Sequence, residues 1–80
     1  MEKILAGMVN IAMKAKELSG CMENLGYQEN PFWDIYAMTA DLIYTALGEK
    51  TDTFDESVTY MVLNSEGVTN EQRVSMLLSK

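Results

Sequence analysis

The stretch ILAGMVNIAMKAKELSGCMENL, residues 4–25, decides the fold of this chain. Its apolar residues recur at alternating spacings of four and three, which keeps them on one face of an α-helix. This stripe comprises Ile4, Met8, Ile11, Ala15, Leu18, Met22 and Leu25. Gly26 follows it, and glycine readily adopts the left-handed backbone that ends a helix. We therefore predict one long helix from Glu2 to about Leu25, whose continuity through Gly20 the sequence leaves open.

The first half of this helix is apolar well beyond that stripe, because further apolar residues widen the arc. A helix that is apolar over most of its circumference must be covered on two sides. We predict that a second copy of the chain provides this cover, so that the protein is a homodimer. The residues assigned to self-association are Leu5, Met8, Val9, Ala12 and Met13. The alternative is a single chain whose last helices fold over the first.

A second helix is predicted from Asn30-Pro31 to about Leu47, because Asn caps helix starts and Pro fits the first turn. Gly48 follows it. The expected inner face consists of Phe32, Ile35, Tyr36, Thr39, Leu42, Ile43, Ala46 and Leu47. Its period again matches a helix rather than a strand.

Two capping boxes predict two further helices in the remainder of the chain. Thr53 with Glu56 opens a helix over roughly residues 54–65, and Thr69 with Gln72 opens a short helix towards residue 80. Strand signals are nearly absent, since no apolar alternation is sustained. The sequence thus predicts a single all-α domain over residues 1–80, a bundle of one long N-terminal helix and three shorter ones.

Charge and cysteine content narrow the partners and the compartment. Six Lys and Arg against twelve Asp and Glu give a net charge of −6. Such an acidic surface disfavours nucleic-acid backbones and anionic membranes, so we expect neither as a partner. Cys21 is the only cysteine, which precludes an internal disulfide bond. With no secretory segment recognised, we expect a reducing, cytoplasmic environment.

The residues needed for most catalytic chemistry are missing. The chain has no histidine, which excludes Ser–His–Asp and Cys–His catalysis and His-type zinc or iron sites. Its glycines are too dispersed for a phosphate-binding loop. Asp34 and Asp41 lie two turns apart on one helix face, and a solvated face is the simpler interpretation of that pair. We therefore expect no catalytic residue, metal or cofactor; a minimal carboxylate enzyme is the last alternative.

Two kinds of residue are candidates for contact with a protein partner. Trp33 lies beside the expected inner face, and Trp is a favoured anchor at interfaces. Met38 lies off the main stripe, and Met adapts to irregular binding surfaces. The densest acidic cluster comprises Glu49, Asp52, Asp55 and Glu56, which could face a basic partner. We assign partner binding to Trp33, Met38 and this cluster.

The first functional hypothesis is therefore a non-enzymatic helical protein that acts by binding protein, as a homodimer. The second is an acidic inhibitor whose carboxylates occupy the nucleic-acid groove of an enzyme. The third is a helix-turn-helix DNA binder, against which the charge argues. No family motif is recognised. In size, acidity and lack of catalytic residues the chain resembles the small helical proteins of phages and mobile elements, a likeness of style rather than of residues.

Overall fold

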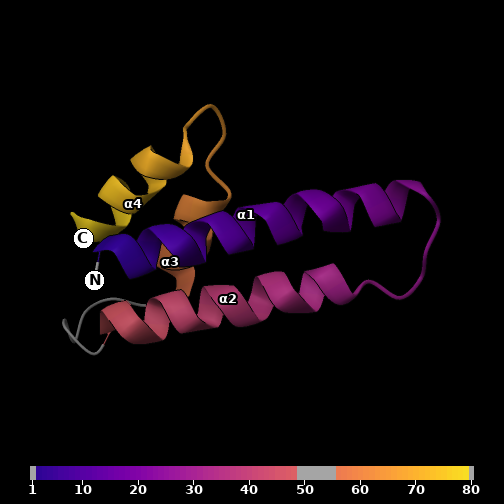
Figure 1. Ribbon diagram of the computed structural model, residues 1–80, viewed down its shortest axis with the longest axis horizontal. Coiled ribbons are helices and arrows are strands. Elements are labelled where there is room, and N and C mark those ends of the chain that lie inside the picture. Colours follow the sequence, from indigo (N-terminus) through magenta and orange to yellow (C-terminus); the bar gives the residue numbers. More distant parts are fainter. Residues whose placement is uncertain (1, 49–55, 80) are drawn as a thin grey trace.

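The computed structural model describes residues 2–48 and 56–79. These residues form four helices and no strand: α1 (Glu2–Asn24), α2 (Pro31–Gly48), α3 (Glu56–Leu63) and α4 (Asn70–Leu78). Helices α1 and α2 form a long antiparallel hairpin, and α3 and α4 pack against the half of it that contains the start of α1 (Figure 1). The prediction of an all-α bundle with one long N-terminal helix is confirmed.

The end of α1 follows the sequence signals. Helix α1 runs unbroken through Gly20. It ends with Gly26 at a φ of 84°, where the Tyr27 N–H donates to the Met22 carbonyl (3.2 Å) and the Gly26 N–H to the Glu23 carbonyl (3.0 Å). This is a Schellman motif, which satisfies the last carbonyls of the helix.

The two predicted capping boxes can be judged separately. At the start of α4, the Gln72 N–H donates to Thr69 Oγ1 (3.1 Å) and the Thr69 N–H donates to Gln72 Oε1 (2.7 Å). Both reciprocal bonds of the predicted box are therefore present. The box of Thr53 with Glu56 and the first residues of its predicted helix lie outside the described residues.

Helix α2 begins at Pro31 as predicted, but Asn30 acts differently from the expected cap. Its side-chain Nδ2 donates to Ser19 Oγ (2.8 Å) and to the Ser19 carbonyl (3.0 Å), while its Oδ1 accepts no hydrogen bond from the described residues. Its backbone carbonyl accepts from the Trp33 N–H (3.1 Å). The side chain of Asn30 therefore joins α2 to α1 instead of capping α2.

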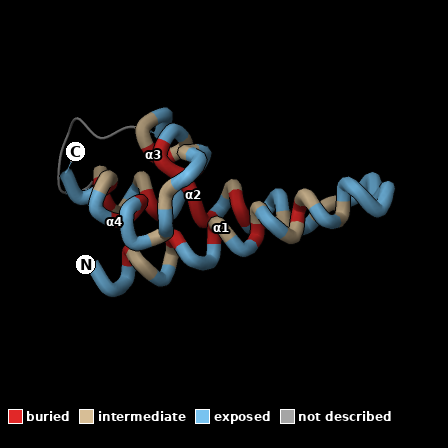
Figure 2. Tube along the Cα trace, turned by 90° about the horizontal axis from the view of Figure 1, so that it is seen from above, coloured by how far each residue is buried: buried red, intermediate tan, exposed pale blue. Residues whose placement is uncertain are grey.

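The hydrophobic core lies where all four helices meet. It comprises Leu5, Val9, Ala12, Ala15, Tyr36, Ala40, Ile43, Leu47, Val62, Leu63, Val74 and Leu77. The buried residues concentrate at the end of the hairpin that carries α3 and α4, and the other end is largely exposed (Figure 2). The last helices of the same chain thus cover the first half of α1. This is the single-chain alternative to cover by a second copy.

The face of α1 that points inward differs from the predicted one. Ile4 and Ile11, placed on the inner stripe by their spacing, are 65% and 54% exposed, whereas Leu5 and Val9 are fully buried. The inward face is therefore turned by about one residue, or roughly 100°. Helices α2, α3 and α4 all contact α1, and the residues central to those three contacts become the core.

The same correction applies to α2. Ile35 and Leu42 were expected on its inner face, yet they are 41% and 59% exposed. Tyr36 and Ile43, each one position further along, are buried as predicted. In both long helices, an outward apolar stripe therefore runs beside the inward one.

The unbroken course of α1 yields a prediction for Gly20→Ala. A Cβ at Gly20 would meet nothing within 4 Å, and alanine is favoured over glycine in a helix interior. We expect the free energy of unfolding in urea to rise by about 0.5–1 kcal/mol. Gly26→Ala is the control: its backbone is left-handed, so the same added methyl should lower stability by about 1 kcal/mol. A loss of stability in Gly20→Ala would contradict a continuous α1.

Candidate interaction surface

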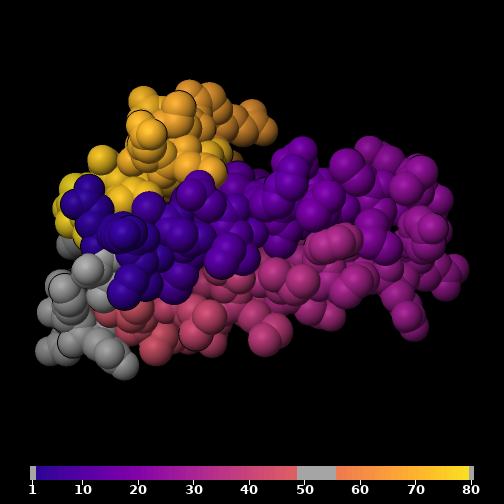
Figure 3. All heavy atoms as spheres, in the orientation of Figure 1, coloured from indigo at the N-terminus to yellow at the C-terminus, as the bar shows by residue number. Residues whose placement is uncertain are grey.

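One long face of the α1–α2 hairpin carries exposed and half-buried apolar side chains. We call it the hairpin face; it consists of Ile4, Ile11 and Leu18 on α1 and Phe32, Ile35, Met38 and Leu42 on α2. In Figure 3, α1 and α2 make up most of the surface turned towards the viewer, and α3 lies behind them in Figure 1. A shallow groove of about 240 Å³ between the two helices is lined by Ile11, Lys14, Ala15, Leu18, Phe32 and Ile35.

The spacing of the hairpin face is that of helices that pack along their length. On α1 its residues Ile4, Ile11 and Leu18 are seven positions apart, and on α2 Ile35 and Leu42 are also seven apart. A seven-residue apolar repeat keeps one stripe of a helix against a neighbouring helix over many turns. The sequence thus contained a signal for this surface, because two adjacent apolar stripes on one helix require two neighbouring elements. The outer stripe was assigned to the core instead of to the surface.

Opposite charges border the two edges of the hairpin face. At 100° per residue, Lys3, Lys14 and Glu17 lie on the side of the α1 stripe that is turned away from α2. Lys14 still borders the groove, and α4 packs along this side of the first half of α1 (Figure 1). Asp34 and Asp41 lie on the edge of α2 that is remote from α1. Lys14 Nζ pairs with Glu17 Oε2 at 3.4 Å, and both side chains are well exposed, so this pair contributes little to stability. Lys3 and Lys14 against Glu17 give the α1 edge a net charge of +1, whereas Asp34 and Asp41 make the α2 edge acidic; the middle of the face is apolar.

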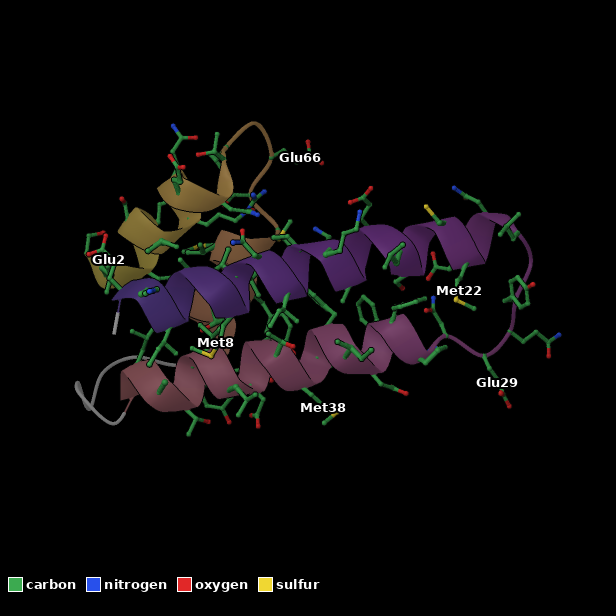
Figure 4. The ribbon with its side chains drawn as sticks, in the orientation of Figure 1. Glu2, Met8, Met22, Glu29, Met38 and Glu66 are labelled. Carbon is green, nitrogen blue, oxygen red and sulfur yellow. The ribbon has the colours of Figure 1, made fainter. Side chains whose placement is uncertain are left out.

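The residues predicted to mediate self-association lie elsewhere. Leu5, Val9 and Ala12 are fully buried in the core of a single chain, so they leave no surface for a second copy. Met8 and Met13 are half-buried and pack against that core. Met8 lies between α1 and α2 in Figure 4. Leu5, Val9 and Ala12 are therefore not exposed to a second copy in this fold, and self-association itself stays a prediction.

The residues predicted to bind a partner are separated by the fold. Trp33 is 53% exposed, and its ring lies 5.3 Å from that of Tyr36, which in turn lies 6.0 Å from Tyr60. Met38 is 67% exposed and points away from the hairpin (Figure 4). Five residues separate Trp33 from Met38, which places them about 140° apart around α2. They belong to different faces, and only Met38 belongs to the hairpin face.

The acidic cluster can be placed only in part. Glu56 is exposed at the start of α3. Glu49, Asp52 and Asp55 lie outside the described residues. Their assignment to partner binding stays a prediction. Within residues 2–48 and 56–79, no group of three His, Cys, Asp or Glu residues is arranged to hold a metal ion.

Three tyrosines have perturbed acidity. Burial, followed by the nearby Tyr60, raises the pKa of Tyr36. The pKa of Tyr44 is raised by hydrogen bonding to Asp41 and by the charge of that carboxylate. Burial also raises the pKa of Tyr60. These shifts move the hydroxyls further from the neutral range in which a general base works.

Arg73, in the first turn of α4, is buried against the turn between α3 and α4. Its Nη1 donates to Asn70 Oδ1 (2.9 Å) and its Nη2 donates to the Ser65 carbonyl (2.7 Å). In the helix-turn-helix hypothesis this residue would supply the positive charge of a recognition helix. Its guanidinium instead fixes a turn inside the fold, which argues against DNA binding by α4.

None of the helices over residues 2–48 and 56–79 has the length and apolar character needed to cross a membrane. No protein-family model, curated protein or solved structure matches the chain. Fold and surface together define its class: a small helical bundle whose longest two helices leave an apolar face uncovered.

Proposed function

We propose that this protein acts without catalysis, by binding another protein chain through the hairpin face. The observation that carries the proposal is the row of exposed branched side chains formed by Ile11, Ile35 and Leu42. Single exposed apolar residues are common, but a contiguous apolar strip is typical of an interaction surface. This strip follows a seven-residue repeat on two adjacent helices, so it suits a partner that presents helices of its own.

Charge supports a protein over a nucleic acid as the partner. The chain has a net charge of −6, and the edges of the hairpin face carry two basic residues against three acidic ones: Lys3 and Lys14 against Glu17, Asp34 and Asp41. A phosphate backbone would be repelled by the whole chain and would find no continuous basic path on this face. The second hypothesis, an acidic inhibitor, depends mainly on residues outside the described part, whereas the apolar strip lies within it.

The test is capture of a partner from a nuclease-treated lysate of the source cell, with Ile35→Glu as the variant. Ile35 is 41% exposed, so glutamate there should leave the fold intact while placing a charge in the contact. We expect the unmodified tagged chain to retain one protein in stoichiometric amount, an untagged copy of the chain included, and Ile35→Glu to lose it. Helical circular dichroism verifies that the variant is folded.

Met61→Glu is the matched control. Met61 is 55% exposed on α3, away from the hairpin face, and its substitution adds the same charge. Capture should persist in this variant. Equal capture by the unmodified chain and by Ile35→Glu, or capture of nothing by either, would contradict the proposal.

A further inference from the structure

We propose that the partner on the hairpin face is a second copy of this chain. The two copies are related by a two-fold axis parallel to the long helices, so that α1 of each lies over α2 of the other. This inference rests on the proposed function and names its partner. It replaces the self-association surface predicted from the sequence, which the fold of a single chain buries.

The hairpin face is suited to its own copy in shape and size. A two-fold axis requires a self-complementary surface, and two antiparallel helices with matching seven-residue stripes provide one. Stacking two such hairpins gives a four-helix bundle. The side of the molecule seen in Figure 3 measures about 40 × 23 Å, and α1 and α2 fill most of it. A standard interface buries roughly 800 Å² on each partner, so it would need most of the α1–α2 surface on this side.

The charged edges select the orientation of the axis. With the axis parallel to the helices, the edge with Lys3 and Lys14 of one copy meets the edge with Asp34 and Asp41 of the other. With an axis across the helices, α1 would lie over α1, and the basic edges would face each other. Like charges opposed across an interface are unfavourable, so the parallel axis is preferred. Either axis leaves every helix antiparallel to its neighbours, as in most four-helix bundles, so only the charges distinguish the two.

The register of the hairpin then identifies a specific ion pair. Lys14 lines the groove together with Phe32 and Ile35, so it is level with the first turn of α2 in its own chain. The hydrogen bond from Asn30 to Ser19 fixes the same register. An axis parallel to the helices leaves that level unchanged. It therefore brings Lys14 of one copy opposite Asp34 of the other, twice in the dimer.

The uncovered half of the hairpin gives an independent reason for a second copy. Beyond Ala15, the only buried residue of α1 is Ser19, and α2 has no buried residue before Tyr36. Helices that bury little of their apolar surface are marginal in water. Packing a second hairpin over Leu18, Phe32 and Ile35 would bury apolar surface at this end.

The first measurement is the mass of the purified chain by sedimentation equilibrium. We expect twice the 9.0 kDa of one chain at micromolar concentration. Ile11→Glu should raise the dissociation constant of the dimer at least about 100-fold, because it buries two uncompensated charges. Met61→Glu, on α3, should change the constant less than about twofold. A monomer at all concentrations, or equal effects of the two variants, would overturn the inference.

A charge exchange tests the orientation. Lys14→Glu and Asp34→Lys should each raise the dissociation constant about tenfold, since each opposes two like charges across the interface. The double variant restores both pairs with reversed sign and should return the constant to within about threefold of the original. In the double variant, the contact between position 14 and Glu17 within each chain is still altered. A recovered dissociation constant therefore reports on the pair between the two chains. A double variant no tighter than the singles would overturn the arrangement.

The two proposals fail in different ways. A monomeric purified chain that still captures a different protein, with capture lost in Ile35→Glu, would overturn the second-copy inference and leave the proposed function intact. A chain that neither dimerises nor captures a protein would overturn both.

Discussion

Leu5→Ala should lower the free energy of unfolding by about 2–5 kcal/mol, the usual cost of removing a buried leucine side chain. Leu5 is fully buried where α1 meets the other helices, although the spacing of the sequence placed Ile4 there instead. An 80-residue chain has a total stability of roughly 4–12 kcal/mol, so this one change could remove a large share of it. Urea unfolding at fixed protein concentration measures the effect.

The matched control is Leu25→Ala, which makes the same chemical change just after the last residue of the same helix. Leu25 is 75% exposed, so its truncation should cost less than about 0.5 kcal/mol. Similar losses for both leucines would mean that α1 is turned differently about its axis, and the core described above would be incorrect.

Arg73→Ala should lower the free energy of unfolding by about 2–3 kcal/mol, because hydrogen bonds made by a buried charged group contribute that much. The substitution removes the donors to Asn70 Oδ1 and to the Ser65 carbonyl, and it leaves that carbonyl without its side-chain donor. It also removes the aliphatic stem that packs in the turn between α3 and α4. Thermal unfolding followed by circular dichroism provides the comparison with the unmodified chain.

Lys16→Ala controls for the change in net charge. Lys16 also donates one side-chain hydrogen bond, to Asn64 Oδ1 at 2.8 Å, but at an exposed site. Its loss should cost less than about 0.5 kcal/mol. If Arg73→Ala is no more damaging than Lys16→Ala, the buried guanidinium does not hold the turn.

The sequence was sufficient for the elements of the fold that depend on local physical chemistry. The Pro31 start of α2, the glycine end of α1 at Gly26 and the capping box at Thr69 each involve residues within one turn of each other. Such interactions are specified by neighbours in the chain, so residue type and spacing predict them. The all-α class follows from the same signals repeated along the chain.

The direction in which α1 faces could not be predicted in the same way. Ile4 and Leu5 are both apolar and adjacent, and only the positions of α2, α3 and α4 decide which is buried. Those contacts join residues far apart in the sequence. The contact of Asn30 with Ser19 also joins residues that are distant in the sequence. An asparagine side chain can cap its own helix or bond to another helix, so residue type alone does not decide between the two. The hairpin face was missed for this reason: its residues were assigned to the core.

Because α3 and α4 cover only one half of the hairpin, α1 is helical throughout but does not resist local opening equally along its length. The part of α1 up to Ala15 shares a core with three other helices, whereas its last two turns depend on α2 and on the hydrogen bonds from Asn30 to Ser19. Local opening costs least where little apolar surface is buried. One continuous 23-residue helix therefore belongs to two units of different stability, and backbone amides near Met22 should exchange with solvent long before those near Val9.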